Sequence, residues 1–370
     1  MTAEETRTLL LSHSDVREIL GSVGIDEFMD SLIASLEAAL RSFDPETTDI
    51  PVRSGFHYDV PAKGLVEWMP VHDAGECVTI KVVGYHPSNP EARNLPSIIS
   101  TMSEYDVQTG HLRALMDGTV ATAMRTGAAS ALATRILTDD RASILGLIGC
   151  GMQSVSQLHA ICRVRHIEEV MFFDLDPRTE GSFIRRVSSL GIEAGMRSAS
   201  IDEILERSDI LCTATSIEIG AGPLFEAREV KPGLHINAVG SDFPGKTEIP
   251  VDLLRSSYVF PDFRGQALIE GECQQLDDED IAADLTELVG RPEDFEGARK
   301  GISVFDSTGW ALEDEVAMRL FRDHARILGI GKYLEIESLE SDPKNPYDLI
   351  AKHLSADGMP EDKGIDSIAA

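Results

Sequence analysis

The sequence predicts an α/β protein in which an α+β domain precedes a doubly wound parallel sheet of the Rossmann type. Three features of the chain support this fold class. Residues 15–43 carry apolar side chains at helical spacing, and short strand-like runs follow from 53 to 117. An apolar run at 144–148 ends in a glycine-rich turn that leads into a helix. Helical and strand-like stretches then alternate as far as residue 307, which is typical of a parallel sheet with crossover helices.

The composition supports more than one hydrophobic core. The chain has 370 residues, of which 42% are hydrophobic, and this is enough for two domains. The 33 Lys and Arg against 63 Asp and Glu give a net charge of −30, which would repel nucleic acids and acidic membranes. We therefore expect neither as a partner. A saline habitat and an ordinary solvated surface explain the acidity equally well.

The five cysteines stand far apart and form no C-x-x-C pair. The sequence therefore indicates neither a disulfide framework nor a zinc site, and we expect no metal and a reducing, cytoplasmic compartment. The N-terminal residues place acids ahead of a very short apolar run and lack the basic region of a signal peptide. No apolar run approaches the length that spans a membrane.

The first part of the chain predicts helices followed by an antiparallel sheet. Residues 15–43 form an apolar stripe, and Asp15 is expected to cap the first helix. Gly110 marks a hairpin turn between two of the later strands. An edge or open face of this sheet could form a homodimer, because most soluble oligomers are symmetric. The four clearest strand runs are LVEWM, VTIKVV, IISTMSEYDV and LRALMD.

Residues 119–137 predict a helix whose small side chains permit close packing of neighbouring backbones. Arg125 lies among these small residues, so it either pairs with an internal acid or faces a ligand. Arg135 stands nearer the helix end, where a solvated charge is the simpler interpretation.

The stretch that follows predicts a strand, a tight turn, a helix and a second strand, as in a dinucleotide-binding unit. Gly149 permits the turn, and Gly151 lets the backbone approach a pyrophosphate at a helix N-terminus. Ser154 stands where a third glycine is common and is small enough for close packing. Asp174 ends the second strand, where a carboxylate can bind two ribose hydroxyls, so we predict NAD rather than NADP. The alternatives are a plain strand-closing turn and an acid at a solvated strand end.

Further alternation completes the predicted parallel sheet. Helices are expected at 179–190 and 201–207, and a long helix at about 312–328 leads back to the first domain. The expected strands are IEAGM, ILCTAT, LHINAVG, YVFPDF and ISVFDS.

Ligands of open α/β sheets bind beyond the carboxyl ends of the strands, which directs attention to the loop after HINAVG. This loop, GSDFPGKTE, contains Asp242, Lys246 and Glu248. Asp242 could act as an acid or base beside a nicotinamide. The alternative is that Asp242 caps a turn.

Four charges of the first domain and its last helix stand among apolar neighbours, namely Arg53, Glu67, Lys81 and Arg125. A charge inside a strand is costly unless it is paired or bound to a ligand. Glu67 and Lys81 could pair with each other across neighbouring strands. Alternatively, the cations could bind the α-carboxylate of an amino acid while the acids bind amines.

These residues lie in motifs that resemble the ornithine cyclodeaminase and mu-crystallin family over nearly the whole chain. The family also includes alanine dehydrogenases, ketimine reductases and the binding protein mu-crystallin, so the resemblance alone does not fix the activity. The matching motifs are EWMP at 67–70, IKVVGYHPSNP at 80–90, ALMDG at 114–118, RTGAAS at 125–130, GCGMQS at 149–154, NAVGSDFPGKTE at 237–248, EGECQQL at 270–276 and VFDSTGWALED at 304–314.

The resemblance implies a role for each matching position. Arg53, Lys81 and Arg125 would bind a substrate carboxylate, and Glu67 and Asp242 would bind amino groups. Asp242 would also move the proton. The implied catalytic residues are Asp242, Lys81 and Glu67, and Met69 joins the implied substrate-binding residues.

A second set of positions is implied to bind the cofactor. Ser97 stands where the ornithine enzyme has threonine, and this exchange keeps a hydroxyl for the phosphate contact. The implied cofactor-binding residues are Ser97, Arg125, Thr126, Gly149, Gly151, Met152, Gln153, Ser154, Asp174, Val239 and Ser307.

Within the family, EWMP and DFPGKTE are similar to the cyclising deaminases, and Trp68, VGYHPSNP and DSTGWALED are closer to the lysine enzymes. The resemblance implies an NAD-dependent cyclodeaminase that converts L-lysine to L-pipecolate or L-ornithine to L-proline and releases ammonia. The alternatives are an amino-acid dehydrogenase or imine reductase, and a nucleotide-dependent binding protein. Glu67 favours a diamine, because a substrate without a second amine has less use for this carboxylate. Asp242 argues against a pure binding protein, which needs no proton shuttle.

The expected domains follow from these assignments. A substrate-binding and dimerisation domain covers 1–128 and is completed by 320–356, and the NAD-binding domain covers 129–319. Residues 357–370 are polar and are expected to form a mobile tail.

Overall fold

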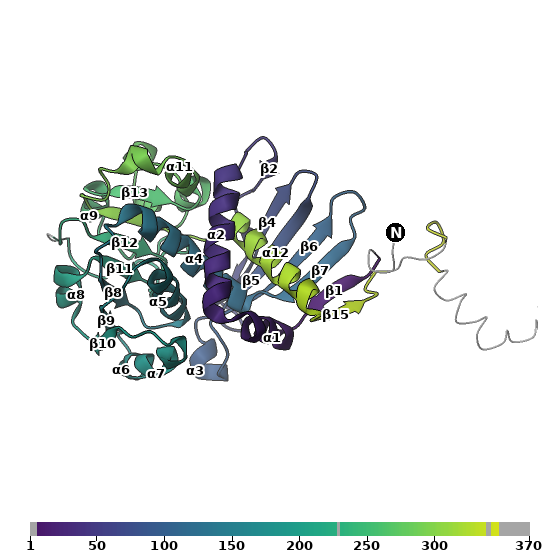
Figure 1. Cartoon of the computed structure of the whole chain (residues 1–370), viewed down its shortest axis with the longest axis horizontal. Helices are drawn as coiled ribbons and strands as arrows, with labels where there is room; N and C mark the ends of the chain where they lie inside the picture. Colours follow the sequence, from purple (N-terminus) through teal and green to yellow (C-terminus); the bar gives the residue numbers. More distant parts are fainter. Residues whose placement is uncertain (1–5, 228–229, 338–341, 348–370) are drawn as a thin grey trace, which may run out of the picture.

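The computed structural model describes residues 6–227, 230–337 and 342–347, and it has the predicted α/β architecture with two separate sheets. Figure 1 shows the sheets in two lobes, with α2 between them. Among the described residues, no helix combines the length and the apolar character needed to cross a membrane. The predicted tail at 357–370 lies outside the described residues.

The first sheet has the order β15-β1-β7-β6-β5-β4-β2, and β3 also pairs with β4. Its neighbouring strands are antiparallel except for β1 and β7, which confirms the predicted antiparallel character. Gly110 adopts a φ of 78° in the turn between β6 and β7, as the hairpin prediction requires. The strands are β1 (Thr8–Leu11), β2 (Thr48–Asp49), β3 (Ser54–Tyr58), β4 (Gly64–Asp73), β5 (Cys77–Tyr85), β6 (Ile98–Asp106), β7 (Leu112–Asp117) and β15 (Lys332–Leu334).

Helices α1 (His13–Val23) and α12 (Ala311–Leu328) lie on one face of this sheet, and α2 (Ile25–Ser42) packs against α12 (Figure 1). The aromatic rings of Phe28 in α2 and Phe321 in α12 lie 4.4 Å apart in the shared core. The predicted return of the last long helix to the first domain is therefore confirmed.

The prediction that Asp15 caps the first helix was wrong in detail. Ser12 is the N-cap, and Asp15 occupies the third helical position, where its carboxylate accepts the Ser12 N–H at 2.7 Å. The two residues form a capping box, which places the helix start before the apolar stripe.

The opposite face of the first sheet carries exposed apolar side chains. Phe56 is 68% exposed, and its ring contacts that of Trp68 on the neighbouring strand. Val82 and Ile99 are exposed on β5 and β6. Because side chains alternate along a strand, these residues point away from the helices that cover the other face.

Helix α4 (Thr119–Leu137) has the predicted bounds and connects the two lobes. It packs against α2 and α12 of the first lobe and against α5 of the second. A Cβ on Gly127 would lie 2.7 Å from the Ser156 carbonyl oxygen. The small residues of α4 thus allow the close approach of α5 that the sequence predicts.

The second sheet is fully parallel and has the order β10-β9-β8-β11-β12-β14-β13, which confirms the doubly wound class. Helices α5 and α8 contribute to separate cores on the two faces of the sheet. The strands are β8 (Ile144–Ile148), β9 (Glu169–Phe173), β10 (Gly195–Ser198), β11 (Ile210–Thr213), β12 (His235–Ala238), β13 (Tyr258–Pro261) and β14 (Ser303–Asp306).

The single helix predicted at 179–190 is broken in the structure. Gly181 ends one short helix, and another begins at Phe183 and runs into a 3-10 turn. Glycine and serine at the junction are poor helix formers. The remaining helices are α3 (Asn89–Arg93), α5 (Met152–Val164), α6 (Pro177–Gly181), α7 (Phe183–Val187), α8 (Ile201–Arg207), α9 (Val251–Arg255), α10 (Arg264–Ala267) and α11 (Leu285–Gly290), with 3-10 turns η1 (Ser188–Leu190), η2 (Glu272–Gln275), η3 (Asp278–Asp280) and η4 (Pro292–Phe295).

The domain boundary at residue 128 remains a prediction, because it falls inside α4 (Thr119–Leu137), which contacts both lobes. The sequence did not predict β1 and β15, which pair with each other at the edge of the first sheet. These two short strands join the beginning of the described chain to the segment that follows α12.

Candidate active site

A pocket lies where the two lobes meet, between β4, β5 and α4 on one side and the loops after β12 and β14 on the other. It therefore stands at the carboxyl ends of parallel strands, as expected for open α/β sheets. The predicted site residues that line it are Arg53, Glu67, Met69, Lys81, Arg125, Thr126, Gln153, Val239, Asp242 and Ser307.

Two buried cations line the floor of this pocket, and both bind acids of α12. Lys81 Nζ lies 2.7 Å from Asp314 Oδ2, and Arg125 Nε donates to Asp314 Oδ1 at 2.9 Å. Arg125 Nη1 donates to Glu313 Oε2 at 2.6 Å. Of the two interpretations of Arg125, the structure therefore shows the internal ion pairs, while the side chain also lines the pocket.

Burial sets the protonation of this group. Burial, with Arg125 nearby, lowers the pKa of Lys81 to about 7, although Asp314 opposes the shift. Burial also raises the pKa of Glu313 to about 8 against the attraction of Arg125. For Arg125, burial alone would lower the pKa, but Asp314 and Glu313 outweigh it and raise the pKa. Arg125 is the permanent cation of this group, and Lys81 is the cation that can lose its charge near neutral pH.

Glu67 and Lys81 do not pair with each other, so the cross-strand alternative was wrong. In the register of β4 and β5, Glu67 lies opposite Val83 and Lys81 lies opposite Met69. The acid partner of Lys81 is Asp314 instead. Glu67 Oε1 forms a hydrogen bond of 2.9 Å with His57 Nε2.

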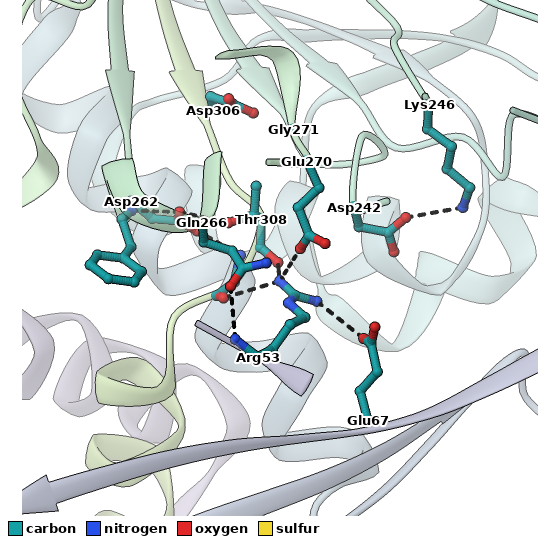
Figure 2. Close-up of polar contacts among 12 residues, drawn as sticks. Arg53, Glu67, Asp242, Lys246, Asp262, Gln266, Glu270, Gly271, Asp306 and Thr308 are labelled. Atoms are coloured by element: carbon teal, nitrogen blue, oxygen red, sulfur yellow. Dashed lines mark hydrogen bonds and ion pairs between the residues drawn. The ribbon is translucent and has the colours of Figure 1, made fainter. Parts of the chain in front are cut away.

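Arg53 reaches across the interface between the lobes (Figure 2). Its guanidinium lies 2.8 Å from Glu270 Oε1 and 3.8 Å from Glu67 Oε2, and it donates to the Thr308 carbonyl. Burial raises the pKa of Glu270 to about 8, and the charge of Arg53 opposes this shift. These contacts anchor Arg53 to the second lobe while its side chain lines the pocket.

Asp242 lies in the loop after β12, and its recorded partner is Lys246, whose Nζ donates to Asp242 Oδ1 at 3.0 Å (Figure 2). The ammonium of Lys246 also lies 4.5 Å from the centre of the Tyr85 ring. Burial alone would lower the pKa of Lys246, but Asp242 and Tyr85 outweigh it and raise the pKa. Lys246 is thus a permanent cation beside Asp242.

Glu248 stabilises the loop that carries Asp242. Its carboxylate accepts the Thr215 N–H at 2.8 Å and the Gly240 N–H at 3.0 Å, which joins the loops after β11 and β12. Burial raises the pKa of Glu248, and these hydrogen bonds oppose the shift. Glu248 therefore supports the loop that carries Asp242 and is not among the described residues that line the pocket.

The predicted dinucleotide turn has the backbone geometry that its glycines suggest. Gly149 adopts a φ of 90°, and a Cβ there would lie 2.5 Å from the Ala214 carbonyl oxygen. At Gly151, the N-cap of α5, an added Cβ would have no neighbour within 4 Å, so open space faces the helix N-terminus. Ser154 is buried and donates from Oγ to the Gly149 carbonyl, which closes the turn.

Asp174 follows β9 and is also bound to the turn. Its Oδ2 accepts the Cys150 N–H at 2.7 Å, and its Oδ1 accepts the Asp176 N–H at 2.9 Å. The carboxylate is half-buried, and each oxygen retains a second lone pair for a ribose hydroxyl. The side chain is thereby held at the position that the fingerprint assigns to it.

A second hollow connects the turn to the first pocket. It is lined by Ser97, Gly151 and Met152 at one end and shares Gln153, Val239 and Asp242 with the first pocket. Ser307 Oγ is buried and has no hydrogen-bond partner among the described residues, so it can bind a ligand atom. The open N-terminus of α5, this hydroxyl and the Asp174 carboxylate fit a dinucleotide that extends from the turn towards Asp242.

Sequence reasoning missed the acids that neutralise the pocket. Glu313 and Asp314 belong to the motif VFDSTGWALED and Glu270 to EGECQQL, but their partners stand 188 or more residues away in the chain. The sequence feature that could have identified Glu313 and Asp314 is a pair of acids next to apolar residues at the start of a long helix. His57 was also missed, because a single histidine in a short strand gives no pattern.

The comparisons with known proteins agree with this geometry. A model described as the ornithine cyclodeaminase/mu-crystallin family matches residues 15–327. The chain is 39% identical to the L-lysine cyclodeaminase of Streptomyces rapamycinicus over 93% of this chain and 100% of that protein. A solved structure of a lysine cyclodeaminase aligns with a TM-score of 0.89 and 41% identity over 93% of this chain and 99% of that one. That structure concerns the recognition of L-lysine, L-ornithine and L-2,4-diaminobutyric acid by the enzyme. An archaeal alanine dehydrogenase dimer with bound NAD aligns with a TM-score of 0.77 and 28% identity over 90% of this chain and 100% of that one.

The buried ion pairs make a prediction about stability. Asp314→Asn leaves Lys81 and Arg125 short of one negative charge inside the protein, and we expect a loss of roughly 3–5 kcal/mol in the free energy of unfolding. The control is Asp323→Asn on the same helix, whose carboxylate is 50% exposed, and it should change stability by less than about 0.5 kcal/mol. Urea unfolding of the three proteins measures both values. Equal stability of the two variants would show that Asp314 does not hold the buried cations.

Proposed function

Because the chain belongs to the ornithine cyclodeaminase/mu-crystallin family, we propose that it is an NAD-dependent cyclodeaminase of basic L-amino acids. It converts L-lysine to L-pipecolate or L-ornithine to L-proline and releases ammonia. The observation that carries this proposal is a single pocket that combines cations for one carboxylate with two carboxylates, Glu67 and Asp242, for two amines.

The cations of the pocket bind the α-carboxylate of the substrate. Lys81 and Arg125 lie on the floor, and Arg53 lies at the edge beside Glu67. Near neutral pH, burial favours the protonated form of Glu313 and Glu270 and so leaves part of the cationic charge free for a ligand. Met69 supplies apolar surface for the methylene groups of the side chain.

NAD⁺, when bound, supplies a nicotinamide that accepts a hydride from Cα and later returns it to the same carbon. The turn at Gly149, Gly151 and Ser154 would hold the pyrophosphate, and Asp174 the adenosine ribose. The other residues proposed to contact this cofactor are Ser97, Arg125, Thr126, Met152, Gln153, Val239 and Ser307.

The protein provides proton transfer and geometry. Asp242 lines the pocket and pairs with Lys246, and in the proposed reaction its carboxylate accepts a proton from one amine and protonates the departing one. Glu67 binds the side-chain amine and bends the substrate back towards Cα. Ring closure then gains from being intramolecular, because the nucleophile is already next to the carbon it attacks.

The finer assignments rest on particular observations. The 39% identity to an L-lysine cyclodeaminase and the Trp68 motif favour lysine, and hence pipecolate formation, over ornithine and proline formation. The exposed apolar face around Phe56, Trp68, Val82 and Ile99 supports a homodimer. Five free cysteines support the cytoplasm as the compartment.

Two other functions found in the family are the alternatives. An amino-acid dehydrogenase or a ketimine reductase would use the same dinucleotide turn, and one aligned structure is an alanine dehydrogenase. A binding protein like mu-crystallin would need no proton shuttle at Asp242. The cofactor stoichiometry separates a cyclodeaminase from a dehydrogenase, and no reaction with a diamine would leave a reductase or a binding protein.

The cofactor stoichiometry tests the proposed reaction. We expect many turnovers per NAD⁺ without steady accumulation of NADH when the protein is given limiting NAD⁺ and excess L-lysine, L-ornithine or L-2,4-diaminobutyrate, since the hydride is returned in each cycle. Ammonium, cyclic product and NADH absorbance are measured together. A difference of one methylene allows a preference of about 10- to 200-fold, and lysine is expected to be preferred. NADH that rises in step with ammonium would instead identify a dehydrogenase, and no reaction would leave a reductase or a binding protein.

Cofactor choice tests the role of Asp174. NAD⁺ should bind more tightly than NADP⁺, because the carboxylate meets the ribose hydroxyls and repels a 2′-phosphate. Titrations followed by tryptophan fluorescence give both dissociation constants. Asp174→Ala should reduce the difference between the two cofactors, and a preference of the unmodified protein for NADP⁺ would contradict the assignment.

The lowered pKa of Lys81 predicts how carboxylate binding depends on pH. Lys81 has a pKa of about 7 in the free protein and must be charged to bind a carboxylate, so a ligand should bind with proton uptake above pH 7. The affinity for L-pipecolate, measured by calorimetry with NAD⁺ present, should fall from pH 7 to pH 9 by up to about tenfold per pH unit. Buffers of different ionisation enthalpy reveal the proton uptake. Absence of uptake at pH 8 would show that Lys81 is already charged or does not bind the carboxylate.

A further inference from the structure

Glu67 lies between the inner pocket and an imidazole that reaches the solvent. The Glu67 side chain is 7% exposed, and its Oε1 is 2.9 Å from His57 Nε2. The His57 side chain is 48% exposed. The other oxygen of Glu67, Oε2, lies 3.8 Å from the Arg53 guanidinium. One hydrogen bond therefore connects a buried carboxylate of the pocket to a solvent-exposed ring.

His57 stands at the wall that separates two hollows. Glu67 lines the inner pocket, whereas His57 lines an outer cleft that shares Leu65, Tyr85, Phe243 and Lys246 with the inner one. The His57 ring packs against the Phe243 ring at a centroid distance of 4.8 Å, next to Asp242 in the loop after β12. The ring thus has one nitrogen at the carboxylate and its remaining edge towards the outer cleft.

The two lysines near His57 have acidic partners of their own. Lys63 pairs with Glu218 across the outer cleft, and Lys246 pairs with Asp242. Asp59, Tyr58 and Tyr85 also line the cleft. Tyr58 is hydrogen-bonded to His86 at 2.9 Å. The charged group at hydrogen-bond distance from the His57 ring is Glu67.

The proposed reaction requires a proton to leave at this place. The side-chain amine of a basic amino acid is an ammonium at neutral pH, and it has no lone pair with which to attack Cα. Glu67 faces this amine in the proposed complex, and because its side chain is only 7% exposed, another group is needed to carry the proton to the solvent. His57 has a suitable distance, a suitable exposure and the side-chain type that exchanges protons near pH 7.

We propose that His57 is the exit for this proton, so that Glu67 and His57 together convert the substrate ammonium into the nucleophile. The inference rests on the proposed cyclodeaminase function. An N–H bond of the ammonium breaks as an O–H bond forms on Glu67, and the proton then passes to His57 Nε2. The imidazolium releases its Nδ1 proton to water, and tautomerisation through water restores the ring. The substrate nitrogen keeps the electron pair, and no oxidant or reductant takes part.

The rival explanation is that His57 only orients Glu67 by donating a hydrogen bond. His57→Gln separates the two roles, because an amide N–H can still donate to Glu67 but cannot carry a proton. A relay residue should lower kcat by about 10- to 100-fold with KM for L-lysine changed less than about threefold. His72→Gln, an exposed histidine on the same strand as Glu67, is the control and should match the unmodified protein.

Transient kinetics locate the defect. Because ring closure follows oxidation of Cα, His57→Gln should accumulate NADH in the first turnover to about one equivalent per site, whereas the unmodified protein should not. His57→Ala opens space beside Glu67, and added imidazole should restore at least about tenfold of its lost rate. Circular dichroism checks that both variants are folded, and His57→Gln carries the test if His57→Ala is not.

The outcomes are distinct. Turnover of His57→Gln at the rate of the unmodified protein, or a loss without NADH accumulation and without imidazole rescue, would overturn the relay and leave an orienting role. If the unmodified protein itself forms no cyclic product from any diamine, the proposed function fails rather than the relay. Slow turnover of His57→Gln with NADH accumulation, together with imidazole rescue of His57→Ala, supports both the relay and the proposed function.

Discussion

Neutralisation of buried charge is the constraint on which the site depends. Lys81 is 1% exposed and Arg125 4%, and an unpaired cation at such positions would cost several kcal/mol. Asp314 binds both cations, and it stands at the start of α12, the last long helix of the chain. The ion pairs thus tie together β5, α4 and α12, and they place the first turn of α12 directly under the pocket.

The same constraint gives the pocket its chemistry. Low exposure strengthens each electrostatic interaction and leaves Lys81 close to losing its proton. The two carboxylates of the pocket, Glu67 and Asp242, also have different neighbours. Glu67 contacts a solvent-exposed imidazole, whereas Asp242 contacts a permanent ammonium on Lys246. Two acids with different neighbours can serve two amines in different steps, which is what a cyclising deamination requires.

Local sequence patterns predicted much of the fold but little of the charge network. The bounds of α4 followed from its run of small residues, and β8 followed from an apolar run that ends at Gly149; both signals depend on near neighbours in the chain. The break at Gly181 and the capping role of Ser12 were missed, since weak local preferences decided them. Partners such as Arg125 and Asp314 are 189 residues apart, so only the assembled fold could identify them. The charged residues that line the pocket were predicted from their apolar neighbours and from family motifs, whereas the buried acids that pair with them were not.

In the proposed cycle, the hydrogen removed from Cα returns to the same carbon after ring closure. L-[2-²H]lysine incubated with the protein and catalytic NAD⁺ in ordinary water tests it by mass spectrometry of the product. We predict L-pipecolate that retains deuterium at C2 and free ammonia in equal amount, because the same nicotinamide would accept the hydride and return it. Product that carries protium at C2, or deuterium that appears in the NADH pool, would show that the hydride is not returned to Cα.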